Sequence, residues 1–395
     1  MKKLWTYENG LLSLLCITFG LVFVDRFAFI YLTPYISSDL NLNNTQIGIL
    51  VSALSLSWAA SGYFTTGWAE ARNKKKPVFI LVTILFSICS ISSGLATGFW
   101  ILLTARLMMG VFEGPTLPLI QSFLAKESTP SRLGFNMGAL QSFGSTLFGM
   151  ILAPVVLVAM AERLGWRSTF YIAGIPGLIM AFLGWLFIKP STAISLEKTE
   201  DSSLSFGELW KYKNVRVATI LSCLGLAWLN SCLTFMPEFF VKVHHIETGN
   251  IGNIMGLMGL SSFLSGIMVT ALSDRMGRKK VISFFLLIGV FYPLSILLLG
   301  GSSLQLVAMF LAFFMFGTFP IIFAAIPFQT VPRHSVGKAI GLIVGVGEIV
   351  GGVIIPFLDG VLADTWGLTM PFWVSTLSAT LAFLISFSLI EPKRA

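Results

Sequence analysis

The sequence has little charge, and this shortage already excludes several classes of protein. Asp, Glu, Lys and Arg make up 11% of its 395 residues, whereas soluble proteins carry about 25%. Hydrophobic residues make up 55%. A water-soluble fold cannot hide so much apolar surface, but a lipid bilayer accepts it on the outside of a protein. We therefore exclude a soluble enzyme and a disordered chain.

Cysteine is also scarce, which excludes a disulfide scaffold. The four cysteines lie inside apolar runs without zinc or redox spacing (Cys16, Cys89, Cys223 and Cys232). Buried cysteine commonly behaves as a small hydrophobic residue, so we expect these four to pack between helices. No nucleophile–base set, nucleotide loop or metal cluster has a credible spacing. The sequence thus predicts neither an enzyme nor a bound cofactor.

Long apolar runs dominate what is present. Because one membrane span needs about 20 mostly apolar residues, the length allows about twelve spans and no sizeable soluble domain. We predict an all-α polytopic membrane protein with twelve transmembrane helices. The expected helices cover residues 11–35, 47–69, 77–97, 100–124, 135–159, 168–188, 215–241, 250–272, 280–300, 304–330, 338–362 and 369–390.

The basic residues predict the orientation of these spans. With a cytoplasmic N-terminus, 21 of the 26 lysines and arginines fall in inner segments. Only Arg163, Arg167 and Lys242 fall outside, and Arg26 and Arg106 lie within spans. Short inner loops rich in Lys and Arg fix orientation, so we expect both termini to be cytoplasmic. The same loops explain the net charge of +8 without a nucleic-acid partner.

The chain divides into two similar halves. We expect six helices in residues 1–190, a cytoplasmic linker at 191–213 with a surface helix around 206–212, and six helices in 214–395. The acidic and basic loop at 70–76 recurs at 274–280. Such a parallel repeat predicts a substrate site near the midplane between the halves, exposed to each side in turn as the halves rock.

The repeated loop carries a resemblance to a known family. Residues 274–279, Asp-Arg-Met-Gly-Arg-Lys, closely resemble the signature loop of the major facilitator superfamily, and the first copy is degraded at Ala71 and Asn73. The resemblance covers essentially the whole chain. It implies that these loops latch the cytoplasmic side in one state. The expected gating residues are Glu70, Asp274, Arg275 and Arg278. Their acids can dock near positive helix N-termini.

A finer resemblance is to the anion:cation symporter family, which includes proton-coupled sugar-acid transporters. It rests on Asp25-Arg26 in the first span, on residues 106–114 in the fourth, and on the turn Gly165-Trp166-Arg167. Trp58 and Glu348 stand where many sugar-acid members have Tyr and Asn. The resemblance implies uptake of a small organic anion with protons and leaves the exact solute open.

Charged side chains at membrane depth predict the site. A charge at the bilayer centre costs roughly 2.5–3.5 kcal/mol on insertion scales, so such groups usually face a cavity. Arg106, Gly110 and Glu113 share one helix face at spacing i, i+4, i+7. We expect Arg26 and Arg106 to hold the anion, because a guanidinium binds both carboxylate oxygens. The alternative is a buried ion pair that only joins helices.

We expect Asp25 and Glu113 to carry the symported protons, which are the expected coupling ions. Desolvation and a neighbouring arginine pull a carboxyl in opposite directions, so either acid can change protonation when the anion arrives. Sodium is the alternative ion, but no dedicated oxygen cluster is apparent. Gln141 and Trp58 are further candidates for substrate contact. Glu348 is either a contact from the second half, a further proton site, or a protonated packing residue.

The expected function is therefore secondary active uptake of a small organic anion, a sugar acid or similar carboxylate, by proton symport with alternating access. The alternatives are a proton-coupled antiporter that exports a drug or metabolite, and a non-transporting membrane sensor. The expected partners are a small anionic solute and the lipid bilayer, with the protein acting as a monomer. We expect it in the plasma membrane, which for a bacterium is the inner membrane.

Overall fold

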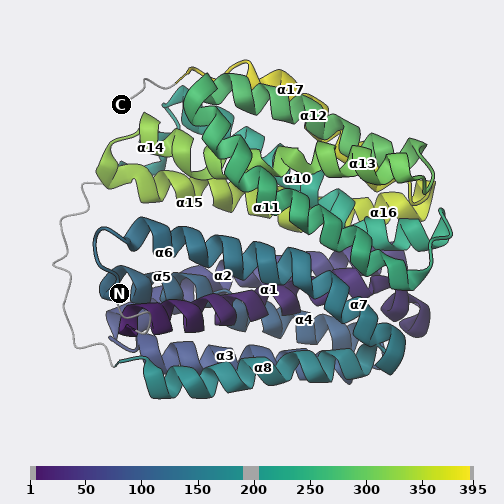
Figure 1. The fold of residues 1–395 in the computed structure, drawn as a ribbon, viewed down its shortest axis with the longest axis horizontal. Coiled ribbons are helices and arrows are strands. Elements are labelled where there is room, and N and C mark those ends of the chain that lie inside the picture. Colours follow the sequence, from purple (N-terminus) through teal and green to yellow (C-terminus); the bar gives the residue numbers. More distant parts are fainter. Residues whose placement is uncertain (1–5, 190–203, 392–395) are drawn as a thin grey trace. The chain divides into compact units, whose positions relative to one another are not determined.

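The computed structural model describes residues 6–189 and 204–391, in which helices joined by short loops are present and no strand is found (Figure 1). The chain forms two compact units. Within the described residues, the first unit comprises 6–42, 53–189 and 247–259. The second comprises 43–52, 204–246 and 260–391. Each unit thus includes a short segment from the opposite half of the sequence.

The helices up to residue 189 are nearly all assigned to the first unit. They are α1 (Tyr7–Leu40), α2 (Asn44–Ala71), α3 (Lys75–Gly94), α4 (Phe99–Glu113), α5 (Thr116–Glu127), α6 (Leu133–Ala139), η1 (Leu140–Leu152), α7 (Ala153–Leu164) and α8 (Trp166–Phe187). Only the first turns of α2 belong to the second unit.

Local signals define the limits of α1. The Thr6 hydroxyl accepts from the backbone N–H of Asn9 and so caps the free donors of the first turn. At the other end Asn41 adopts the left-handed conformation with φ of 51°, which ends the helix. The 34-residue helix is therefore longer at both ends than the predicted span 11–35.

The predicted single helix over 100–124 is wrong, because two helices separated by a short turn occupy this range. α4 ends at Glu113 and α5 begins at Thr116. Pro115 lies between them and has no N–H with which to continue the helical hydrogen bonds. The break directly follows Glu113, one of the predicted site residues.

The second unit contains most helices beyond residue 203. They are α9 (Phe206–Leu209), α10 (Lys213–Lys242), η2 (Thr248–Asn250), α11 (Ile251–Met276), α12 (Arg278–Leu298), α13 (Ser303–Ala312), η3 (Phe313–Thr318), η4 (Ile321–Ala325), α14 (Ile326–Thr330), η5 (Arg333–Ser335), α15 (Val336–Gly347), η6 (Glu348–Ile354), α16 (Ile355–Trp366) and α17 (Met370–Ser386). η2 and the start of α11 belong to the first unit. The π-helical stretches η1 and η6 interrupt the predicted spans 135–159 and 338–362.

Of the surface helix predicted around 206–212, the structure forms α9 at Phe206–Leu209, while residues 191–203 of the predicted linker lie outside the described residues. Ser205 and Glu208 form a capping box, in which each side chain bonds the backbone of the other. Hydrogen bonds from the Ser205 backbone N–H and hydroxyl hold the pKa of the Glu208 carboxyl below its usual value.

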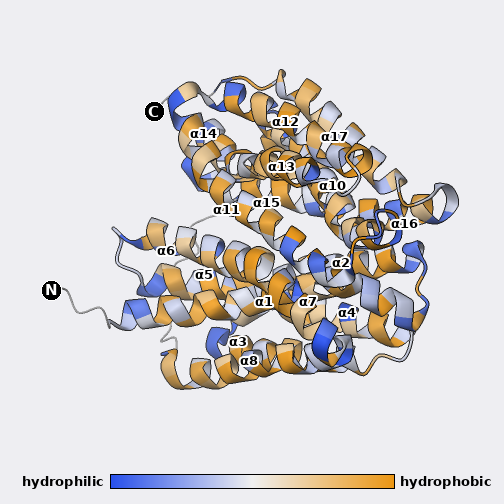
Figure 2. Cartoon of the chain, turned by 45° about the vertical axis from the view of Figure 1, so that its right-hand side comes forward, coloured by the Kyte–Doolittle hydropathy of each residue, from blue (hydrophilic) through white to orange (hydrophobic). Residues whose placement is uncertain are grey.

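The described residues contain ten helical segments long and apolar enough to cross a membrane. Figure 2 shows hydrophobic colour along most of the helices, with hydrophilic colour gathered toward their ends and in the loops. α17 is also apolar but has 17 residues, and α4 has 15. The architecture is therefore a multi-pass helical membrane fold. The count of twelve spans and the cytoplasmic termini remain predictions.

Candidate functional site

Arg106 is the most deeply buried cation of the first unit. It lies on α4 and is 1% exposed. Its guanidinium carbon lies 4.8 Å from the centre of the Phe29 ring. Nη1 makes long hydrogen bonds of 3.4 Å to the backbone carbonyls of Asp25 and Arg26 and one of 3.8 Å to the Met109 sulfur, while Nε and Nη2 have no partner among the described residues. A buried cation with unused donors is costly, so Arg106 can bind a further acceptor.

Asp25 is also buried, and its backbone carbonyl accepts the hydrogen bond from Arg106 Nη1. The Ser90 hydroxyl on α3 donates to its Oδ1 at 2.7 Å. Arg106 acts on the same carboxylate electrostatically. Three helices therefore position this acid. Sequence reasoning did not identify Ser90, because a lone serine in an apolar run carries no signal of its own.

Glu113 lies two turns beyond Arg106 on α4 and is completely buried. Neither of its carboxyl oxygens has a hydrogen-bond partner among the described residues. The charges that act on it are those of Asp25, Arg26 and Arg106. The structure thus brings all four predicted charged residues of the first unit into one cluster.

Arg26 differs from Arg106 in being only half-buried. Its guanidinium carbon lies 4.9 Å from the centre of the Trp58 ring on α2. Such a cation–π contact favours a fixed orientation of the planar fork. Of the two arginines, Arg26 is the one with a surface that a solute can reach. Trp58 orients it.

Close packing of α2 against α4 holds this cluster together. A Cβ on Gly110 would lie 2.1 Å from the Ser57 hydroxyl and 2.4 Å from the Leu54 carbonyl. The Ser61 hydroxyl donates to the Gly110 carbonyl at 3.1 Å. Only glycine permits this approach, which places Arg106 and Glu113 on either side of the contact with α2.

The other two predicted contacts, Gln141 and Glu348, lie on helices other than α1, α2 and α4, which contain the charged cluster and Trp58. Gln141 on η1 is exposed and donates to the Ser145 hydroxyl at 2.9 Å. Glu348 begins η6 in the second unit and is half-buried. It belongs to the other unit, so its role as a substrate contact stays a prediction.

The second signature loop forms a compact set of contacts. Asp274 pairs with Arg278 at 2.5 Å, four residues along. The carboxylate of Glu391 accepts from the backbone N–H groups of Arg278 and Lys279 and so caps α12. Sequence reasoning missed Glu391. Arg275 lies in the last turn of α11, and Glu70 lies in the last turns of α2. The latching role of these residues stays a prediction.

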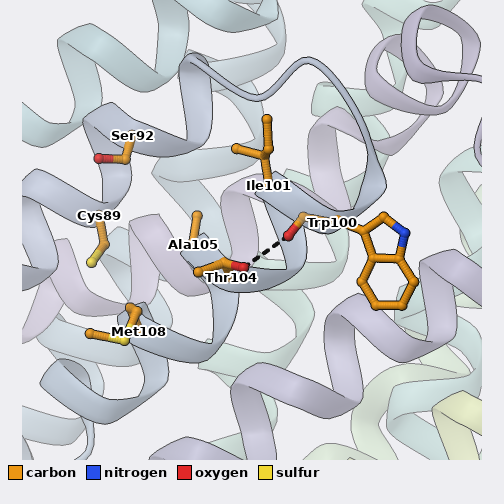
Figure 3. Close-up of a pocket in the computed structure, with 7 residues that line it drawn as sticks. All are labelled: Cys89, Ser92, Trp100, Ile101, Thr104, Ala105 and Met108. Carbon is orange, nitrogen blue, oxygen red and sulfur yellow. Dashed lines mark hydrogen bonds between the residues drawn. The ribbon is translucent and has the colours of Figure 1, made fainter.

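A shallow pocket of about 460 Å³ lies between α3 and α4 (Figure 3). Its lining includes Cys89, Trp100 and Met108, and it contains no charged side chain. Thr104 in its wall donates to the Trp100 carbonyl of its own helix at 2.9 Å. An anion finds no counter-charge there, so we do not place the solute in this pocket.

Two buried acids of the second unit were overlooked in the sequence. Glu238 on α10 and Asp359 on α16 are both 0% exposed. They fall inside the predicted spans 215–241 and 338–362. Each lies near the end of its predicted span, where an acid looks exposed, so the sequence carries no signal of its burial.

Comparison with known proteins identifies the family. Residues 15–349 match the Major Facilitator Superfamily. The chain belongs to this superfamily.

Three similar proteins are named as transporters of organic acids. The hexuronate transporter of Bacillus subtilis is 27% identical over 87% of this chain and 85% of its own length. The sialic acid transporter NanX of Escherichia coli is 24% identical over 94% and 92%. The probable sulfoacetate transporter SauU of Cupriavidus necator is 22% identical over 95% and 92%. The predicted resemblance is confirmed, and the chain is a transporter and not an enzyme.

Solved structures show the same fold. A bacterial homolog of the human lysosomal transporter Spinster, inward-facing and occupied, superposes with a TM-score of 0.78. The match covers 96% of both chains at 18% identity. At this identity the likeness concerns the fold alone.

Proposed function

We propose that this transporter takes up a small organic anion, a sugar acid or similar carboxylate, by proton symport with alternating access. One observation carries the proposal: two arginines and two acids cluster inside the first unit, and Arg106 and Glu113 retain polar atoms without partners there. Relatives that carry hexuronate, sialic acid and sulfoacetate support an anionic solute.

The arginines have different tasks in this proposal. Arg26 is half-buried and oriented by Trp58, so its fork contacts the carboxylate of the solute directly. Arg106 balances the charge of Asp25 and Glu113 from within the helix bundle. When the solute withdraws positive charge from this cluster, Glu113 or Asp25 gains a proton, because two unneutralised carboxylates are unfavourable in a buried place. Solute and proton then move together.

Uptake by purified protein in proteoliposomes tests this function. An acidic outside and an alkaline lumen should drive accumulation of one member of a panel of sugar acids, amino-sugar acids and short sulfonates. A protonophore should abolish the accumulation. Arg26→Gln should prevent it, whereas Arg132→Gln, at a surface pair 3.8 Å from Glu8, should not. Accumulation driven by sodium, or solute efflux coupled to proton entry, would contradict the proposal.

A further inference from the structure

A second group of buried polar side chains lies on α10 and α16, outside the cluster used above. Both carboxyl oxygens of Asp359 lack a hydrogen-bond partner among the described residues, and so do the buried hydroxyls of Ser231 and Thr234. Ser231 lies beside the Asp359 carboxyl but outside good hydrogen-bond geometry. Burying such oxygens without partners costs free energy. Their clustering therefore points to a ligand.

The way α10 packs against the segment from α15 to α16 places Thr234 at about the same depth as Asp359. Gly347 faces Ser222, and Gly351 faces Leu226, which is an offset of 125 residues in both pairs. The helices run in parallel, so the same offset pairs Asp359 with Thr234. Measured from the helix ends at Trp366 and Lys242, the two residues lie about 10 and 12 Å deep at 1.5 Å per residue. The Asp359 carboxyl oxygens and the Thr234 hydroxyl, which lack hydrogen-bond partners among the described residues, therefore lie at similar depth in the second unit.

A polar stripe connects this level with the end of α10. Ser231, Thr234 and Glu238 follow the spacing i, i+3, i+7 and so share one helix face. Glu238 is buried and pairs through Oε2 with the Lys242 ammonium at 2.7 Å. Lys242 is 50% exposed. Hydrogen-bonding side chains thus extend from the surface to Asp359 along one face.

We propose that Asp359 is a second proton-binding site of the transporter, which exchanges its proton with the Lys242 end of α10 along Glu238, Thr234 and Ser231. A proton from water at that end forms an O–H bond on the carboxylate, and no other covalent bond changes. A proton fits the site better than sodium, because a metal ion needs more oxygen ligands than one carboxylate and two hydroxyls supply. The proposal does not depend on Asp25 or Glu113.

The other titratable groups around Asp359 are few. On α10 they are Cys232, whose thiol donates to Ser375, and Glu238 with its partner Lys242. On its own helix Asp364 accepts hydrogen bonds from Asn44 and Thr45. The preceding turns contain Glu348, α12 contributes Tyr292 near Cys232, and α17 has no ionisable residue. No cation is among these contacts except Lys242, which already has Glu238.

Infrared difference spectra of the full-length protein in lipid test the site without a transport assay. Carbonyl bands of protonated carboxyls should appear in acidic and disappear in alkaline buffer, and Asp359→Asn should remove one of them while those of Asp25 and Glu113 remain. Asp364→Asn, a change on the same helix at a hydrogen-bonded carboxylate, should leave this band in place. If the wild type and Asp359→Asn show the same titrating bands, the proposal fails. It also fails if sodium at constant pH removes the band, since the ligand would then be sodium.

The rate of the response tests the path. After a pH jump, the Asp359 band should change several-fold more slowly in Thr234→Val than in the wild type. Thr219→Val is the matched control, because the buried Thr219 hydroxyl already donates to the Val215 carbonyl of its own helix at 2.8 Å. Equal rates in Thr234→Val and the wild type would overturn the path. Because these spectra need no solute, failure of this site and failure of proton symport are distinguishable.

Discussion

At the level of single residues, two arginines that look equivalent in the sequence differ in how deeply they are buried. We therefore expect them to have different functions. Arg26 and Arg106 are both arginines at membrane depth, yet one is half-buried beside Trp58 and the other is enclosed beneath Phe29. A guanidinium that a solute can reach binds both oxygens of the solute's carboxylate. An enclosed guanidinium instead influences the protonation of the acids beside it. Substitutions at the two positions should therefore affect different measurements.

Glu113→Gln should abolish uphill uptake while preserving solute exchange. Glutamine imitates the protonated acid in shape and charge, so the cluster can bind and release solute but can no longer couple to protons. Accumulation driven by a pH gradient and exchange across equal solute concentrations measure the two properties separately. Glu127→Gln on the neighbouring α5 is the matched control and should retain both. Retained accumulation by Glu113→Gln would remove this acid from the coupling mechanism.

Arg106→Lys should impair the coupled reaction although the positive charge is kept. The guanidinium reaches two backbone carbonyls of α1 and covers the Phe29 ring, which an ammonium cannot do with the same geometry. Losing charged hydrogen bonds of about 1.5–3 kcal/mol corresponds to a fall in transport of roughly 10- to 100-fold. Initial rates against solute concentration measure it. Wild-type rates in this variant would show that the planar fork has no function there.

The charged residues of this cluster could be predicted, but their surroundings could not. Asp25, Arg26, Arg106 and Glu113 are conspicuous because charges are rare in apolar runs. Ser90 contacts Asp25 and Phe29 contacts Arg106 only because α3 and α1 pack at those points. Asp359 escaped notice because it lies toward the end of a predicted span, where an acid looks exposed. The packing of α10 on α16 buries it.

At the level of helices, close contact between α2 and α4 depends on one glycine. Gly110→Ala should destabilise the protein by about 1–3 kcal/mol, the usual cost of inserting a group into a packed interface. The added Cβ would lie 2.1 Å from the Ser57 hydroxyl and 2.4 Å from a backbone carbonyl that cannot rotate away. Thermal unfolding in detergent measures the change.

Gly138→Ala is the matched control for this helix contact. Its Cβ would meet nothing within 4 Å, and alanine is the better helix former by about 0.8–1.0 kcal/mol. The unfolding temperature of this variant should therefore be unchanged or higher. If Gly110→Ala were as stable as Gly138→Ala, α2 and α4 would not be held at the distance the structure shows.

Helix positions could be predicted well, and helix interruptions could not. The run over 215–241 corresponds to α10 at Lys213–Lys242, because a long apolar segment in lipid must satisfy its own backbone hydrogen bonds. The break at Pro115 carries a sequence signal that was overlooked. The π-helical stretches η1 and η6 carry none, since they depend on packing against neighbouring helices.

At the level of the whole molecule, a short segment from the first half of the sequence is tied to the last helices. Residues 43–52 belong to the second unit. There the Asp364 carboxylate accepts from both the backbone N–H and the side chain of Asn44 and of Thr45, at 2.6–2.9 Å. It caps the N-terminus of α2 from more than 300 residues away. The Ser52 hydroxyl adds a bond to the Val353 carbonyl at 2.6 Å.

We expect these bonds to break in one of the states of the proposed alternating access, because the rest of α2 belongs to the first unit. Asp364→Asn should weaken them, because an amide group offers one acceptor where the carboxylate offers two and carries no charge for the helix terminus. In a cysteine-free background, the thiol of Ser52→Cys should then react faster with a water-soluble maleimide. Thr365→Val is the matched control, since the Thr365 hydroxyl bonds only the carbonyls of its own helix among the described residues. Reaction rates equal in all three backgrounds would mean that the Asp364 cap does not restrain the segment at 43–52 during transport.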